Sequence, residues 1–267
     1  MSRIVALALN TFREAIRNKV LYLLALFGVG LIVLSVPFSQ GALHEQMRVT
    51  RDVGLAGIEL FGVLIAVFVG VNLVYKEVDR KTVFALIPKP IHRYEFILGK
   101  FVGMLMTLAV MFAIMSALMA AVLSVQTEAT NAPSNSAAIV RAIALLFCEV
   151  TVVTAIAVLF SSFSTPILSG AFTLGMAVVG HFTPELRELT ARIGTVPSRI
   201  AIAGAMRLFP DLNLFYVSGA MVGGQRVTVH GSFVDWGYVG TAALYGAAYS
   251  GCALALAMII FSRRDFV

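Results

Sequence analysis

The sequence predicts an all-α membrane protein that crosses the bilayer six times. Of its 267 residues, 59% are hydrophobic and only 13% are charged, whereas soluble domains average about 45–50% apolar and about 25% charged residues. A chain this apolar also cannot stay solvated as a disordered segment. The apolar residues gather in six continuous runs, and as helices most of these are long enough to cross a hydrocarbon core of roughly 30 Å. Continuous rather than alternating runs disfavour membrane-spanning strands.

The six predicted spans belong to one transmembrane domain that covers residues 1–267. They are Val20–Val36, Val53–Tyr75, Phe101–Ser124, Ile139–Phe160, Ser164–Phe182 and Tyr238–Phe261. The first and the fifth are the shortest. The first span is not expected to be a cleaved signal peptide, because 19 residues precede it and no small-x-small site follows it.

Basic residues predict the orientation of the spans. Lys and Arg concentrate in three segments that would share one side, namely the N-terminal segment, the loop after the second span and the C-terminus. By the positive-inside rule, both termini are predicted to be cytoplasmic. The same rule accounts for the formal net charge of +6, so nucleic acid is not expected as a partner; no basic stripe with interleaved aromatic residues occurs.

The N-terminal segment, residues 1–19, predicts an amphipathic helix. Asn10, Arg13, Glu14 and Arg17 share one face, and apolar residues such as Leu9 occupy the other. Such a helix is suited to lie at the membrane surface, with its arginines near lipid phosphates. The alternative is that it extends the first span into the cytoplasm.

In the predicted cytoplasmic loop Lys76–Lys100, we expect a short helix over Lys76–Ile87. It should end there because Pro88 and Pro90 break helical structure. A second short helix, His92–Lys100, is expected to lead into the third span. Two interpretations stay open for this loop. It could dock into the groove of a partner, or it could be an ordinary solvated loop.

The outer segment, residues 183–237, is too long to lack structure of its own. We expect it to be helical, with helices over Arg199–Phe209 and Asp211–Val222 separated at Pro210. A short extended turn is expected at Gln225–Ser232.

Glu149 lies near the middle of the fourth span, where a carboxylate is costly and suggests a functional site. It could line a transport path, face a subunit interface, or only form a structural hydrogen bond to a neighbouring helix. Glu59 and Arg141 lie nearer the ends of their spans, and snorkelling towards water explains them more simply.

Methionines form a stripe on the third span, consisting of Met104, Met111, Met115 and Met119. Thioethers suit Cu(I), and Met111 and Met115 are candidates for a transport path or an interface. The simpler interpretation is that these flexible side chains fill gaps between helices, because no Cys or His joins the stripe. No metal or other cofactor is therefore predicted. Small residues also recur at every fourth position in the second and sixth spans, which indicates close helix packing inside the subunit or across a dimer.

Four groups of residues occur in order along nearly the whole chain. They are Phe12-Arg13-Glu14 with Arg17 and Lys19; Glu77, Thr82, Leu86, Pro90, Arg93 and Gly99-Lys100; the bend Ser161–Ser164; and Phe209–Phe215 with the C-terminal Phe261–Phe266. Together they resemble the permease subunits of ABC-2 type transporters, the membrane half of ATP-binding-cassette exporters. Lys81 stands where that family usually has Gly.

The resemblance implies a permease that moves a substrate, most simply outward, across a prokaryotic inner membrane. It implies a dimer of two identical or different permease chains, working with cytoplasmic ABC ATPase subunits that bind the ATP. The loop would then carry a coupling helix seated on the ATPase. The residues implied in that contact are Glu77, Asp79, Arg80, Lys81, Thr82, Phe84 and Arg93. The Ser161–Ser164 bend would make a smaller second contact.

The chain itself is not expected to be an enzyme. It has no G-x-x-x-x-G-K-[ST] phosphate-binding loop, since Gly99-Lys100 is followed by Phe101 and precedes a span. The alternative function is a stand-alone secondary transporter or channel driven by an ion gradient. Against it, the two halves of the chain show no obvious repeat.

Overall fold

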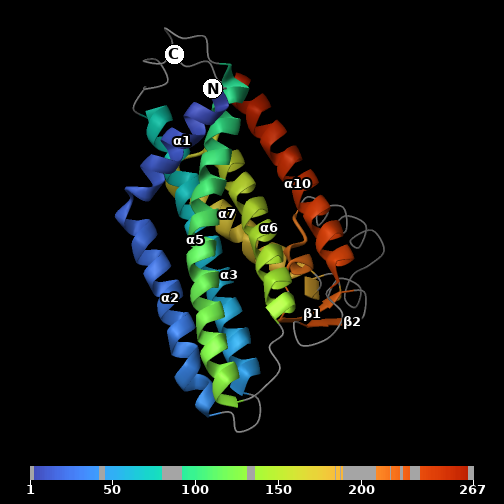
Figure 1. The fold of residues 1–267 in the computed structure, drawn as a ribbon. Helices are drawn as coiled ribbons and strands as arrows, with labels where there is room; N and C mark the ends of the chain where they lie inside the picture. Colours follow the sequence, from blue (N-terminus) through green and yellow to red (C-terminus); the bar gives the residue numbers. More distant parts are fainter. Residues whose placement is uncertain are drawn as a thin grey trace.

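The computed structural model describes most of the chain as a bundle of long helices (Figure 1). The residues described are 3–41, 46–79, 92–130, 136–183, 185–186, 188, 209–216, 218–222, 225–228 and 235–263. Their elements are α1 (Arg3–Ile16), α2 (Lys19–Gln40), α3 (Gln46–Asp79), α5 (Arg93–Thr130), α6 (Ser136–Ser161), α7 (Pro166–His181), the 3-10 turn η1 (Leu212–Leu214), β1 (Ser218–Val222), β2 (Gln225–Thr228) and α10 (Trp236–Arg263).

Within the described chain, five helices are long and apolar enough to cross a membrane, namely α2, α3, α5, α6 and α10. They coincide with the first, second, third, fourth and sixth predicted spans. The fifth predicted span, Ser164–Phe182, forms α7, which has 16 residues and is therefore only about 24 Å long. It starts late because Thr165 is extended and Pro166 occupies the first turn. The prediction of six full-length spans is thus not met at α7.

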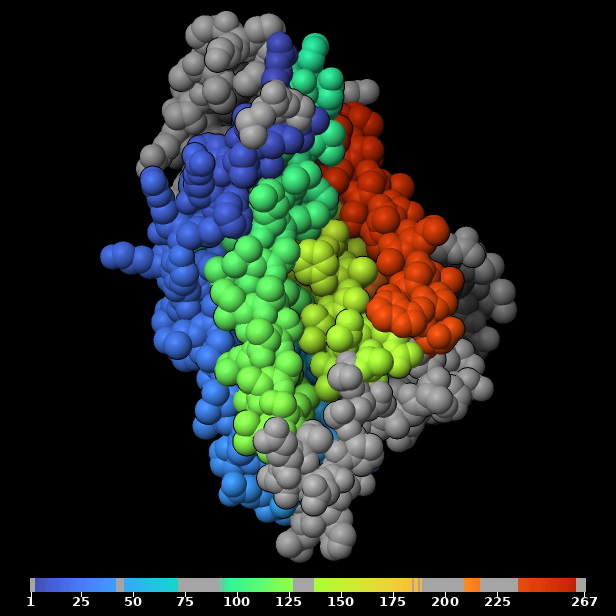
Figure 2. Space-filling model, viewed as in Figure 1, coloured from blue at the N-terminus to red at the C-terminus, as the bar shows by residue number. Residues whose placement is uncertain are grey.

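α1 is a helix separate from α2. It ends at Ile16, and the side chain of Asn18 accepts a hydrogen bond from the Val20 N–H (3.1 Å) as the N-cap of α2. α1 packs against α5, burying Ala8, Thr11 and Ala15. In the space-filling view, α1 lies across the N-terminal end of α5 (Figure 2). Its contact with a membrane surface stays a prediction.

The two helices that flank the loop predicted to be cytoplasmic differ from the prediction. α3 continues without a break to Asp79, so Glu77 and Asp79 extend the span instead of starting a new helix. The short helix expected over His92–Lys100 is present from Arg93, but it is continuous with the third span as α5 and is not a separate helix. α5 contains no proline between Arg93 and Thr130, so nothing breaks the helix before the span. At its start, the Glu95 carboxylate accepts a hydrogen bond from the His92 N–H (3.0 Å).

The outer segment is less helical than predicted where the structure describes it. Asp211–Val222 was expected to be a helix, but only the turn η1 is helical and β1 follows it. β1 pairs antiparallel with β2, in line with the extended turn expected at Gln225. The sequence signal we missed is the Gly223-Gly224 pair, which between two short runs is typical of a hairpin. The predicted helix Arg199–Phe209 lies outside the described residues except for Phe209.

α3 forms the centre of the bundle, packed against α2, α5, α6 and α7. Gly62 and Gly70 let it approach its neighbours, because a Cβ at Gly62 would lie 2.7 Å from Phe112 and one at Gly70 would lie 2.5 Å from Ala157. The small-residue stripe of the second span therefore packs inside the subunit. The stripe of the sixth span differs, since Ala247, Gly251 and Ala255 are exposed.

The starts of α1 and α5 and the end of α10 lie at the same end of the bundle (Figure 1). Arg3 is 3.8 Å from the Glu95 carboxylate, and the rings of Phe96 and Phe261 stack with centroids 5.8 Å apart. Lys100 is buried here, with its ammonium nitrogen 5.4 Å from the centre of the Phe96 ring. This end carries the basic segments that predict the cytoplasmic side.

Candidate functional site

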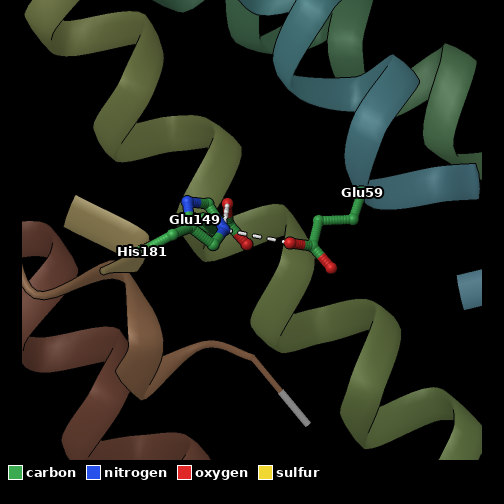
Figure 3. A group of neighbouring side chains, drawn as sticks. All are labelled: Glu59, Glu149 and His181. Atoms are coloured by element: carbon green, nitrogen blue, oxygen red, sulfur yellow. Dashed lines mark hydrogen bonds and ion pairs between the residues drawn. The ribbon is translucent and has the colours of Figure 1, made fainter. Parts of the chain in front are cut away.

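Three ionisable side chains from three helices meet inside the bundle (Figure 3). The His181 Nε2 atom lies 2.9 Å from Glu59 Oε1 and 3.2 Å from Glu149 Oε1. Glu59 comes from α3, Glu149 from α6, and His181 is the last residue of α7. We call these three residues the Glu–His cluster.

The cluster lies deep between the ends of the helices. Glu149 is 12 residues before the end of α6, which places it about 18 Å from that end. There the Ser161 hydroxyl donates a hydrogen bond to the Gly70 carbonyl on α3 (3.4 Å), after which the chain bends over Ser162–Ser164. α7 then returns along α6 and α3. Because it is short, its C-terminal residue stops at the depth of the two glutamates.

The outer segment fixes the end of α7. The Asn213 amide donates a hydrogen bond to the His181 carbonyl (3.1 Å), and the Asp211 N–H donates one to the Tyr245 hydroxyl on α10 (2.9 Å). Gly180 permits this contact, since a Cβ there would lie 2.8 Å from the Pro210 carbonyl oxygen. The Phe209–Phe215 segment therefore holds His181 in position, a role that the sequence motif alone did not reveal.

Hydrogen bonding defines the orientation of the imidazole ring. His181 Nδ1 lies 2.9 Å from the Ala177 carbonyl oxygen, one turn earlier on α7. A carbonyl can only accept, so Nδ1 must carry a hydrogen. Nε2 is consequently the atom that faces both carboxylates.

Burial makes the charge of the cluster costly. Glu149 is fully buried, and the side chains of Glu59 and His181 are 14% and 27% exposed. Neither oxygen of Glu149 has a hydrogen bond of good geometry among the described residues. Even with a protonated imidazole, two carboxylates leave a net negative charge in an apolar region. A further positive charge, from a proton or a metal ion, would relieve this cost.

A cavity of about 600 Å³ adjoins the cluster. Glu59 and His181 form part of its wall, together with the polar side chains of Glu185, Asn213 and Tyr216. The rest of the lining is apolar, from α3 and α7, and includes Leu60 and Val178. An apolar cavity with a few convergent polar groups is the usual form of a small-ligand site.

The prediction for Glu149 identified one member of this cluster. The snorkelling explanation for Glu59 was wrong, because its carboxylate turns inward to His181. His181 was missed, although it is the single histidine of the four in the sequence that falls inside a predicted span. Arg141 is half-exposed, and its Nε donates a hydrogen bond to the Ala137 carbonyl (3.0 Å).

The other predicted site residues lie elsewhere. Glu77 and Asp79 end α3, and Arg93 begins α5. Arg80, Lys81, Thr82 and Phe84 lie outside the described residues. Met111 and Met115 are buried inside the single chain and do not line this cavity, so a role for them in transport stays a prediction.

Comparison with known proteins identifies the family. The family model described as ABC-2 family transporter protein matches residues 5–187. This range includes most of α1, the long helices α2, α3, α5 and α6, the short helix α7, and all three members of the cluster. This chain belongs to the ABC-2 transporter family. The resemblance seen in the sequence is thereby confirmed, and the ABC-2 permease is a multi-pass membrane protein. A comparison with curated proteins gives no match.

Proposed function

We propose that this ABC-2 permease is the membrane half of an ATP-driven exporter in the inner membrane of a prokaryote. The observation that carries the proposal is the family match over residues 5–187. In this proposal two permease chains form the transport unit, and ATP is bound and hydrolysed by separate ABC ATPase subunits. The lack of a phosphate-binding loop motif in the sequence supports this division of labour.

The ATPase would bind at the end of the bundle where α3 ends and α5 begins. The start of α1 and the end of α10 lie there too (Figure 1), which agrees with a cytoplasmic location for both termini. Glu77, Asp79 and Arg93 flank the loop at this end. The adjoining residues Arg80, Lys81, Thr82 and Phe84 would complete the coupling surface.

α3 offers a direct mechanical link between this surface and the membrane interior. It is a single helix of 34 residues, and Glu59 lies 20 residues, or about 30 Å, before its end at Asp79. A rigid helix transmits a displacement of one end to the other. Closure of the ATPase dimer would therefore move Glu59 relative to the helices α6 and α7 that carry its partners. In this mechanism α7 and the Phe209–Tyr216 segment together form the fifth of six crossings, and α10 forms the last one.

The proposal is tested by reversing charge at the coupling end. We expect Glu77→Lys combined with Asp79→Lys to lower the amount of ATPase subunit that co-purifies with the permease in mild detergent. The reason is that docking on a charged surface depends on charge complementarity. The matched control is Asp235→Lys, which also reverses an exposed charge. Asp235 lies just before the start of α10, whereas the proposed coupling surface is at the end of the bundle where α10 ends.

The two possible failures have different meanings. If the wild-type permease co-purifies with an ATPase and the Glu77/Asp79 variant binds it equally well, the coupling surface is assigned wrongly. If the wild-type protein purifies from its native membrane without any ATPase, and shows no ATP-dependent transport in lipid nanodiscs or vesicles, the exporter proposal fails. The ion-gradient transporter would then be the better explanation.

A further inference from the structure

We propose that Glu59, Glu149 and His181 form a binding site for a divalent transition-metal ion of the Zn²⁺ type. Each of the three side chains offers one ligand atom, and these atoms all lie within 4.8 Å of one another. This site does not depend on an ATPase partner. It can be tested on the permease alone.

The distances fit the first coordination shell of such an ion. Zn–N and Zn–O bonds are about 2.0–2.2 Å, which places tetrahedral ligand atoms about 3.3 Å apart. His181 Nε2 lies 2.9 Å from the nearer Glu59 oxygen and 3.2 Å from the nearer Glu149 oxygen. The ligand atoms of Glu59 and Glu149 lie within 4.8 Å of each other. A small adjustment of the three side chains would therefore bring them around the ion.

The second ring nitrogen of His181 is arranged as in metal sites. A histidine ligand usually donates its other N–H to a carboxylate or a backbone carbonyl, which fixes the tautomer and the ring orientation. His181 Nδ1 makes this contact with the Ala177 carbonyl (2.9 Å). This leaves Nε2 next to both carboxylates (Figure 3), and in a neutral ring with hydrogen on Nδ1 this nitrogen carries the lone pair that would bind the ion.

Glu149 gives independent evidence that the cluster accepts a ligand. Its side chain is fully buried, points at His181, and neither oxygen makes a hydrogen bond of good geometry with the described residues. A buried carboxylate without hydrogen bonds is strongly destabilising. A divalent cation would coordinate one of its oxygens and bring two carboxylates and a neutral imidazole to zero net charge.

The donor set selects among metal ions. One imidazole and two carboxylates suit Zn²⁺ and neighbouring first-row ions, whereas Ca²⁺ requires six to eight oxygen ligands and Mg²⁺ near-octahedral oxygen coordination. Three protein ligands leave a fourth position. Because Glu59 and His181 line the adjoining cavity, that position would face the cavity, where an ion can exchange and a small ligand can reach it.

The test is metal binding by the full-length permease in lipid nanodiscs after removal of bound metal with a chelator. We expect Co²⁺ to bind with one ion per chain and to give the visible absorption of a low-symmetry four-coordinate site. Zn²⁺ should displace it. Glu149→Gln and His181→Gln should each weaken Zn²⁺ binding at least tenfold, because each removes one of three ligands.

Asp235→Asn is the matched control, because Asp235 is exposed before α10, does not line the cavity and is not in the cluster. It should bind Co²⁺ and Zn²⁺ as the wild type does. If Glu149→Gln does not fold, the partly exposed Glu59 provides Glu59→Gln for the same measurement. The proposal is overturned if the wild type binds neither ion stoichiometrically, in which case the cluster holds protons only. It is also overturned if folded cluster variants retain wild-type affinity.

Discussion

At the scale of single residues, two kinds of unusual side chain inside the spans have different surroundings. Glu149 is buried beside a histidine from another helix and lacks hydrogen bonds of good geometry. The four methionines of the α5 stripe, Met104, Met111, Met115 and Met119, are buried among apolar side chains. Met115 packs against Gly28 of α2, and Met119 packs against Gly54 of α3. The buried carboxylate of Glu149 is the kind of group that a bound cation would stabilise. Packing alone explains the methionines.

Met115 provides the test of the packing interpretation. Met115→Leu conserves volume and should cost less than about 1.5 kcal/mol in the free energy of unfolding. Met115→Ala should cost roughly 2–5 kcal/mol, because it leaves a cavity between α2, α3 and α5. Denaturant unfolding in detergent micelles measures both. If Met115→Leu abolishes transport while stability is retained, the thioether itself has a function.

At the scale of elements, α1 is held to α5 by close backbone approach. Gly99 and Gly103 are four residues apart on α5, and a Cβ on Gly103 would lie 2.5 Å from the Ala8 carbonyl oxygen and 2.6 Å from Thr11 Cβ. Small residues at this spacing let two helices pack tightly. α1 is thus fixed to the start of α5, the helix that follows the proposed coupling loop, and it moves together with that end of the bundle.

Gly103→Ala is expected to loosen α1. The added methyl has no room unless α1 shifts, and such overpacking costs about 1–3 kcal/mol. Hydrogen–deuterium exchange of the α1 amides should become faster, while exchange in α6 stays unchanged. The control is Gly175→Ala on α7, where a Cβ meets nothing within 4 Å; there we expect equal or slightly greater stability. Unchanged exchange in α1 would contradict the packing described.

At the scale of the whole molecule, the helices form a polarised bundle. The end that carries Arg3, Glu95 and Phe261 joins the start of α1, the start of α5 and the end of α10. The opposite end carries the end of α2 at Gly41. The cluster lies between the two ends, where α7 stops short of a full crossing.

This polarity predicts which positions face the cytoplasm. In a background with Cys148→Ala and Cys252→Ala, we expect Lys19→Cys and Ser262→Cys to react with a membrane-impermeant maleimide only after the cells are permeabilised. Gly41→Cys should react in intact cells. Residues 19, 41 and 262 are all exposed, so the membrane decides whether the reagent reaches them. Labelling of Lys19→Cys and Ser262→Cys from opposite sides would show that the number of crossings is not even.

The sequence by itself determined the class of protein, the positions of five spans, the separate N-terminal helix and the family, because these follow from local composition and periodicity and from short motifs in order. Glu149 was also found this way, since a carboxylate inside an apolar run is unusual wherever it points. Only the tertiary structure decided that α7 is short, that Glu59 turns inward, and that His181 joins the two glutamates. These facts depend on contacts between residues up to 122 positions apart. The rotation of each helix about its axis and its depth relative to its neighbours decide such contacts, and a local sequence pattern contains neither.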